Sequence, residues 1–128
     1  MELNYIEQDG VHIVAFLEAR LFDDVVVQES RRQIEELLAQ HSFDRLLLDL
    51  RSVSVAGSAA LGMLIRLKSR CAQRHCRLAL CGLQPSVQEA VRITQLDKIF
   101  EIYKDLEGAV AALQTTSAAG PTGPTLLR

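Results

Sequence analysis

The chain has 128 residues, of which 48% are hydrophobic and 23% are charged, as is typical of one compact domain with a sizeable core. Its formal net charge of −2 argues against general nucleic-acid binding, which usually requires a basic face. No apolar run approaches the roughly 18 residues of a membrane-spanning helix, and residues 1–4 lack the basic and apolar regions of a signal peptide. We therefore expect a cytoplasmic protein that neither binds nucleic acid nor inserts directly into a membrane.

Two strands joined by a tight turn are predicted at the beginning of the chain. Val11–Leu17 is apolar and rich in strand-forming residues, and a first strand, Asn4–Gln8, precedes it. The Asp9–Gly10 pair between them is the strongest short hairpin-turn signal. We therefore expect the two strands to pair antiparallel.

A helix of about four turns is predicted next. Asp23 and Asp24 supply its N-cap, and it ends near Gln40. Its apolar positions recur at helical spacing and should be buried, namely Val27, Ile34, Leu37 and Leu38. Its charged positions should face water, namely Glu29, Arg31, Arg32, Glu35 and Glu36.

The second half of the chain alternates between strands and helices. Arg45–Leu50 has almost no polar alternation, as expected for a strand that is covered on both faces. Pro85 suits the first position of a helix because its φ is fixed, and the buried side of that helix should consist of Val87, Ala90, Val91 and Ile93. The other predicted elements are a helix at 58–73, a strand at 77–81, a short strand at 99–102 and a helix at 106–113.

This order of elements predicts a single α/β domain. We expect a mixed, mostly parallel sheet of about five strands, with about four helices packed against it. Residues 1–114 would form the domain. Residues 115–128 are polar and punctuated by Pro and Gly, so we expect a disordered C-terminal tail.

The three cysteines, Cys71, Cys76 and Cys81, have a five-residue spacing that fits no common zinc pattern. Cys71 lies on a predicted helix and Cys81 ends a predicted buried strand, where free cysteines behave as small hydrophobic residues. His75 beside Cys76 is a weak indication of a metal ligand, since structural zinc normally takes four closely arranged ligands. We expect reduced thiols, no metal site and no cofactor.

The clearest candidate site is the junction that ends at Ser58. A loop of small residues, 52–57, connects the buried strand to a helix and delivers Ser58 to the start of that helix. The free backbone N–H groups and the positive end of the helix dipole tolerate a phosphate there. Two hypotheses follow: Ser58 is the N-cap of the helix, or it is a phosphorylation site.

The first turns of this helix have the composition of a binding surface. Ala59, Ala60 and Gly62 leave it nearly bare, and Gly62 costs roughly 1 kcal/mol relative to Ala in a helix interior. Close approach by another backbone or by a partner protein would compensate for that cost. Met63, Arg66 and Arg70 share one face with this turn and would add apolar and basic contacts. A solvated helix face is the alternative explanation for the basic residues here, which also include Lys68, Arg74 and Arg77.

A phosphate on Ser58 would add about −1.5 to −2 charge units. The helix would tolerate that charge, but a partner docked over the bare turn would be repelled. Asp49, at the end of the buried strand, and Gly57 are the candidates for ordering the loop, Asp49 by accepting backbone N–H bonds. The alternative role for Asp49 is to help arrange a nucleotide–metal complex that a kinase brings. These features predict a binding switch.

An enzyme is the competing hypothesis, and it requires a base that activates the serine. His12 is predicted in a strand, and His41 and His75 are predicted in turns. No motif links any of them to Ser58, and the Gly-x-Ser-x-Gly elbow is absent. We therefore expect that the protein is not an enzyme.

Three segments resemble the STAS domain family, and specifically the bacterial anti-sigma factor antagonists. Asp49–Gly62 is similar to the family's strand ending in Asp-Leu-Ser and its loop Val-x-Phe-Ile-Asp-Ser-Ser-Gly-Leu-Gly. Leu78–Val87 resembles the family's next strand and turn, and Ile93–Tyr103 resembles its Leu-Thr-Gly-Leu and Phe signature. Together the resemblance covers about residues 3–113.

The resemblance implies a partner-switching module for transcription regulation. In such systems an unphosphorylated antagonist binds an anti-sigma factor that is also a serine protein kinase, and a sigma factor is released. The kinase phosphorylates the antagonist on a serine, which corresponds here to Ser58, and a serine phosphatase resets it. Gly57 replaces the usual Asp, and Ala59 and Ala60 replace Ser and Gly. The alternative within the family is a docking subunit of a signalling scaffold or a membrane transport system, without a phosphoswitch.

Overall fold

The computed structural model describes residues 3–21, 23–42 and 44–115. In chain order its elements are β1 (Leu3–Gln8), β2 (Val11–Phe16), β3 (Arg20–Leu21), α1 (Asp24–Gln40), β4 (Arg45–Asp49), β5 (Val55–Ala56), α2 (Ser58–Gln73), β6 (Arg77–Cys81), α3 (Pro85–Ile93), the 3-10 helix η1 (Leu96–Lys98), β7 (Glu101–Tyr103) and α4 (Leu106–Thr115).

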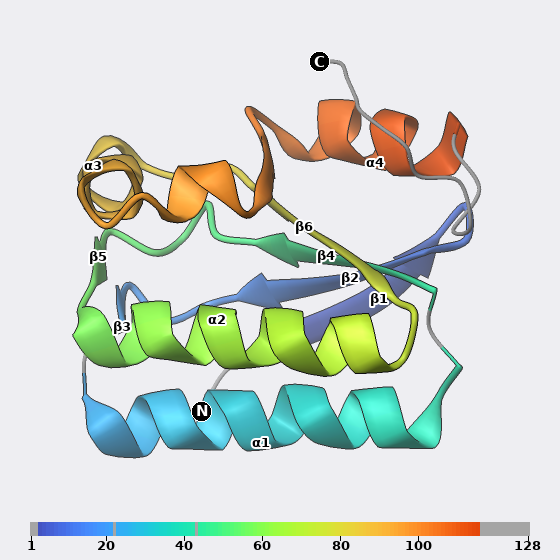
Figure 1. Cartoon of the computed structure of the whole chain (residues 1–128), viewed down its shortest axis with the longest axis horizontal. Coiled ribbons are helices and arrows are strands. Elements are labelled where there is room, and N and C mark those ends of the chain that lie inside the picture. The colour runs from blue at the N-terminus through green and yellow to red at the C-terminus, as the bar shows by residue number, and fades with distance from the viewer. Residues whose placement is uncertain (1–2, 22, 43, 116–128) are drawn as a thin grey trace.

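The central sheet lies between two layers of helices (Figure 1). Its strand order is β1-β2-β4-β6-β7, with β1 and β2 antiparallel and the other neighbours parallel. Alternate residues of β4 point to opposite faces: Leu46 and Leu48 join the core under α1 and α2, whereas Leu47 joins the core under α4. The predicted α/β domain, with a mostly parallel five-stranded sheet and four helices, is confirmed.

Local sequence signals explain where the first elements begin and end. Asp9 and Gly10 have φ values of 55° and 82°, so both adopt the left-handed conformation that a tight hairpin turn requires. Asp23 caps α1, with its carboxylate accepting a hydrogen bond of 2.8 Å from the Val25 backbone N–H. The predicted hairpin and N-cap are confirmed.

The exposed side of α1 is narrower than predicted. Arg31 and Glu35 are half-buried because α1 packs against α2, and their ion pair of 3.1 Å lies near that contact. Glu29 is also partly buried, and Leu37 is half-buried rather than fully buried. Helical periodicity predicted the buried stripe correctly but could not show which polar neighbours a second helix would cover.

Two short strands were not predicted. β3 and β5 form a separate parallel pair, in which Arg20 lies opposite Val55 and Leu21 lies opposite Ala56. The small residues of 52–57 predicted only a loop. A strand of two residues has no periodicity to detect, so only the tertiary structure reveals this pair.

Three details of the second half also differ from the prediction. Ile93 is 66% exposed, not buried, because it is the last residue of α3. The predicted strand at 99–102 begins only at Glu101, since η1 occupies 96–98 and ends at Ile99. Helix α4 extends to Thr115, which was assigned to the tail; the rest of that segment, 116–128, lies outside the described residues.

The cysteines occupy buried positions and are not in disulfides.

At the end of α2, the Cys76 N–H donates to the Cys71 carbonyl at 2.8 Å and the His75 N–H donates to the Ala72 carbonyl at 3.3 Å. These bonds form a Schellman motif, with His75 at a φ of 57°. Burial raises the pKa of the Cys81 thiol to about 12. The described residues contain no cluster of three potential metal ligands.

No helix in the described ranges is both long enough and apolar enough to cross a bilayer.

Gly82 supports a close contact between β6 and the loop after β4. Its φ is +73°, and a Cβ at this position would lie 2.5 Å from Cγ of Arg51. We predict that Gly82→Ala destabilises the fold by about 2 kcal/mol, because both the left-handed backbone and the contact become strained. Urea unfolding measures this. The control is Gly62→Ala, where a Cβ would meet nothing within 4 Å; equal unfolding midpoints for the two variants would contradict the prediction.

Candidate functional site

The candidate site is built on the loop that connects β4 to α2, and its first anchor is Asp49. Its side chain is only 3% exposed. The carboxylate accepts a hydrogen bond of 3.1 Å from the Arg51 backbone N–H and holds the Arg51 guanidinium at 2.9–3.1 Å. Hydrogen bonding to this carboxylate raises the pKa of Arg51. Asp49 thus lies where a loop-ordering residue must lie.

β3 and the residue before it, Ala19, provide the second anchor of the loop. The Ala19 carbonyl accepts hydrogen bonds from the backbone N–H groups of Ser54 at 2.7 Å and Val55 at 3.2 Å. The Gly57 N–H donates to the Leu21 carbonyl at 2.9 Å. Gly57 contributes through this backbone bond, since its φ of −89° is open to any residue.

The start of α3 provides the third anchor. The Gln84 side-chain amide donates to the Arg51 carbonyl at 2.7 Å, and the Ser86 hydroxyl donates to the Ser54 carbonyl. The loop is therefore held from three directions: by β4 itself, by β3 and by the β6–α3 junction. Such a loop presents the residue that follows it in a fixed position.

Ser58 follows this loop as the first residue of α2, and its side chain is exposed. The hypothesis that Ser58 is the N-cap is wrong, because that position belongs to Gly57, whose carbonyl accepts a hydrogen bond of 3.1 Å from the Leu61 N–H. Gly57 offers no side chain to cap the helix. The N–H groups of the first turn and the positive end of the dipole therefore lie beside the Ser58 hydroxyl.

The exposed ridge of α2 runs from Ser58 through Gly62 and Arg66 to Arg70, which are all exposed and spaced by one helical turn. Two of the residues predicted to bind a partner are not on it. Ala60 is 1% exposed and faces the core, and Met63 is 3% exposed. Ala59 is half-buried beside the ridge. The bare first turn is thus narrower than the sequence suggested.

A groove with a volume of about 260 Å³ lies beside this ridge, between α1 and α2. Val27 and Met63 contribute apolar side chains to the groove. On the α2 side, Ala59 and Gly62 have only small side chains or none, so the wall of the groove is shallow there. The polar residues that line it are Asp24, Gln28, Arg31 and Arg66. Met63 thus contributes to the wall of a groove and not to a protruding surface.

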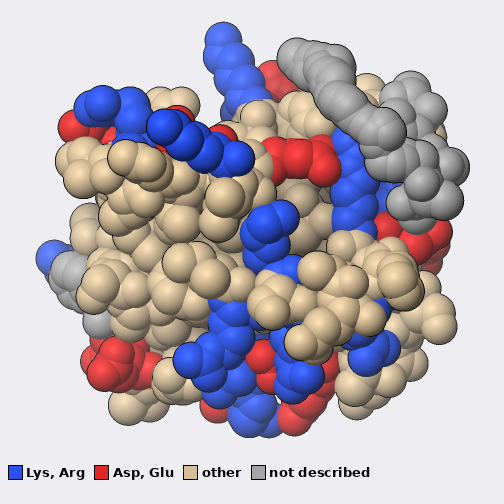
Figure 2. All heavy atoms as spheres, in the orientation of Figure 1, with Lys and Arg blue, Asp and Glu red and all other residues tan. Residues whose placement is uncertain are grey.

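The basic side chains around α2 differ in how far they are neutralised. Figure 2 shows them gathered over α1 and α2, with acidic residues between them. Arg74 donates to the Leu38 carbonyl, Lys68 lies 5.7 Å from the centre of the Phe100 ring, and Arg77 pairs with Glu101 at 2.7 Å. These three residues therefore have partners within the fold.

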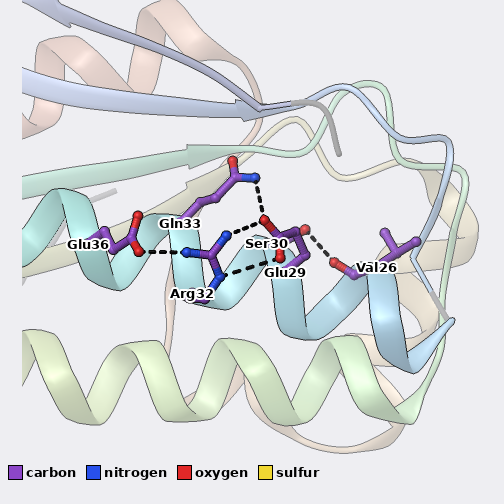
Figure 3. A network of polar contacts seen from close by, with 6 residues as sticks. All are labelled: Val26, Glu29, Ser30, Arg32, Gln33 and Glu36. Atoms are coloured by element: carbon purple, nitrogen blue, oxygen red, sulfur yellow. Dashed lines mark hydrogen bonds and ion pairs between the residues drawn. The ribbon is translucent and has the colours of Figure 1, made fainter.

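The exposed side of α1 is also neutralised internally. Arg32 lies between Glu29 and Glu36 and pairs with both, while Gln33 donates to Glu29 (Figure 3). The Ser30 hydroxyl donates to the Val26 carbonyl at 2.9 Å in the same network. Arg66, in contrast, forms no hydrogen bond or ion pair with the described residues.

One exposed apolar residue near the site was not predicted from the sequence. Ile65 on α2 is 46% exposed, next to the ridge that carries Gly62 and Arg66. The sequence contains a signal for it, because Ile65 lies one helical turn after Leu61 and widens the apolar stripe of the helix. Periodicity alone could not show that the stripe extends beyond the core.

A family model for the STAS domain matches residues 3–109. An anti-sigma factor antagonist from Mycobacterium paratuberculosis has a similar structure, with 24% identity, a TM-score of 0.78, and coverage of 88% of this chain and 93% of that chain. The anti-sigma factor antagonist SpoIIAA in its unphosphorylated form matches with 13% identity, a TM-score of 0.73, and coverage of 91% and 100%.

The chain is also similar to part of a larger protein. The murine Solute Carrier 26 family member A9 anion transporter matches with 18% identity and a TM-score of 0.71, over 87% of this chain but only 19% of the transporter. At these identities the structural likeness establishes the fold.

We predict that Asp49→Ala destabilises the protein by about 2 kcal/mol, because the Arg51 N–H and guanidinium lose a buried, charged acceptor. Limited proteolysis should also cut the 50–57 loop faster. The control is Asp44→Ala, which removes an exposed carboxylate 3.9 Å from Arg45 and should change stability by less than about 0.5 kcal/mol. Unchanged loop cleavage in Asp49→Ala would show that Asp49 does not order the loop.

Gly62→Ala should stabilise the isolated protein by up to about 1 kcal/mol, because Ala has the higher helix propensity and its Cβ would meet nothing within 4 Å. Thermal and urea unfolding measure the change. A loss of stability would mean that the fold itself requires glycine at this position.

Proposed function

The chain belongs to the STAS domain family, and we propose that it acts as an anti-sigma factor antagonist by partner switching. When unphosphorylated it binds an anti-sigma factor that is also a serine protein kinase, and a sigma factor is thereby released. Phosphorylation of Ser58 by that kinase ends the binding, and a serine phosphatase restores it. The protein would carry out this transcription regulation in the cytoplasm.

The observation that supports the proposal best is the exposed Ser58 at the uncapped start of α2, held by a loop with three anchors. A phosphate adds about −1.5 to −2 charges. The helix N-terminus stabilises an anion, so the fold retains its structure in both states. Only the surface offered to the partner changes.

A binding role also agrees with where the histidines lie. The Tyr5 hydroxyl and Nδ1 of His12 are 2.8 Å apart, and the ring of His41 lies 5.9 Å from that of Tyr5. His12 lies at the amino end of β2 and His41 precedes the amino end of β4, whereas Ser58 follows the carboxyl end of β4 and the loop after it. Burial also lowers the pKa of His12. We therefore propose a binding protein without enzymatic activity and without a cofactor.

A docking subunit without a phosphoswitch is the second candidate. It is favoured by the likeness to a part of the murine anion transporter. In that role the α2 ridge would contact a transport protein or a signalling scaffold, and Ser58 would stay unmodified.

Phosphopeptide mapping of the chain from its native cells, in growth and under stress, tests the proposal. We expect one phosphate, on Ser58, and an anti-sigma factor kinase that co-purifies with the unphosphorylated chain. Ser58→Asp should weaken this complex by about tenfold or more, whereas Ser58→Ala should retain it.

The matched control is Ser52→Asp, since Ser52 is exposed in the same loop. Its effect on the complex should be small. A chain unmodified under all conditions, or a phosphate on another residue, would remove the switch and favour the docking subunit.

A further inference from the structure

The charges around the α1–α2 groove are unequally distributed along its length. At the end next to Ser58 lie Asp24 and the N-terminal turns of both helices. About two turns further along α2 lies Arg66, and Arg70 follows it. The second end of the groove is therefore positive.

The positive end has too few carboxylates within the fold. Arg70 reaches Glu35 at 3.5 Å, but Glu35 already pairs with Arg31 at 3.1 Å. Arg66 lines the groove without an ion pair to the described residues. A complementary surface would supply the missing negative charge.

The shape of the α2 side of the groove allows close approach. Gly62 is exposed in the middle of α2, and apart from its chain neighbours and the nearby backbone of its own helix, no described atom lies within 4 Å of where its Cβ would be. The fold gains nothing from glycine there and loses roughly 1 kcal/mol relative to Ala. A partner backbone that lies against Gly62 would account for it, while Met63 and Val27 line the groove as almost completely buried side chains.

We propose that this groove binds an acidic segment of the partner protein, with its carboxylates on Arg66 and Arg70 and its backbone against Gly62. This inference rests on the proposed partner-binding function and adds the chemistry of the partner. The neutralised exposed side of α1 does not compete for such a segment (Figure 3).

The sign of the partner's charge explains how a phosphate on Ser58 would act. The phosphate would stand at the same end of the groove as Asp24 and raise the negative charge there. An acidic segment would then be repelled by like charge, while the helix N-terminus still stabilises the phosphate. The loss of partner affinity that phosphorylation causes should therefore become smaller as the salt concentration rises.

Fluorescence anisotropy with the full chain and labelled peptides tests the inference. The probes are short peptides, each with two Glu whose spacing varies between members. A second set has Lys in place of each Glu. We expect saturable binding by the acidic set only, at an ionic strength of about 50 mM.

Matched variants locate the binding. Arg66→Glu should weaken binding by about tenfold, whereas Lys104→Glu, with the same change in net charge at an exposed residue before α4, should leave it within about twofold. Gly62→Leu should block binding and Gly62→Ala should reduce it less. Absence of binding by the whole acidic set, equal binding by the Lys set, or equal effects of Arg66→Glu and Lys104→Glu would overturn the inference.

Peptide binding to the Ser58→Asp variant distinguishes a failure of the groove proposal from a failure of the proposed phosphoswitch. Acidic peptides that bind equally to the chain and to Ser58→Asp would support the groove and contradict the switch. Peptides that fail to bind, together with a phosphate-dependent natural complex, would support the switch and contradict the groove.

Discussion

The candidate site depends on a loop whose first residues contact the buried carboxylate of Asp49. This carboxylate binds both the backbone and the guanidinium of Arg51 at about 3 Å, and the Arg51 side chain in turn lies over Gly82, where no Cβ fits. Gln84 then holds the Arg51 carbonyl from the start of α3. These contacts connect the loop to β4, β6 and α3, and Ser58 follows the loop as the first residue of α2.

The anchored loop limits the ways in which a phosphate on Ser58 can affect partner binding. Phosphorylation that ordered or melted a segment would require a bistable element, but the loop is already anchored by β3, by α3 and by Asp49. The proposed switch therefore operates at the surface, through charge and bulk beside the ridge of α2. Gly62 lies on the same surface. It lowers the stability of α2 slightly and leaves a part of the helix surface that no other part of the fold contacts.

Much of the fold could be predicted because its signals are local. The Asp9–Gly10 turn, the Asp23 cap and Pro85 at the start of α3 each act on their own neighbours. What could not be predicted depends on contacts between distant segments. The β3–β5 pair forms only when the chain is folded, and the burial of Met63 and Arg31 depends on how α1 packs against α2. The position of Ser58 at the start of α2 was predicted correctly. The N-cap, however, is Gly57 and not Ser58, because the residue at which a helix begins depends on the backbone angles at Gly57.

The central claim is that Ser58 carries its phosphate without a change of fold. Hydrogen exchange of the chain phosphorylated at Ser58, compared with the unmodified chain, tests it most directly. We expect amide protection in β4, in β5 and throughout α2 beyond its first turn to be the same in both forms. A loss of protection that spreads through the loop and along α2 would show that the phosphate acts by unfolding the site, and would contradict the proposed surface switch.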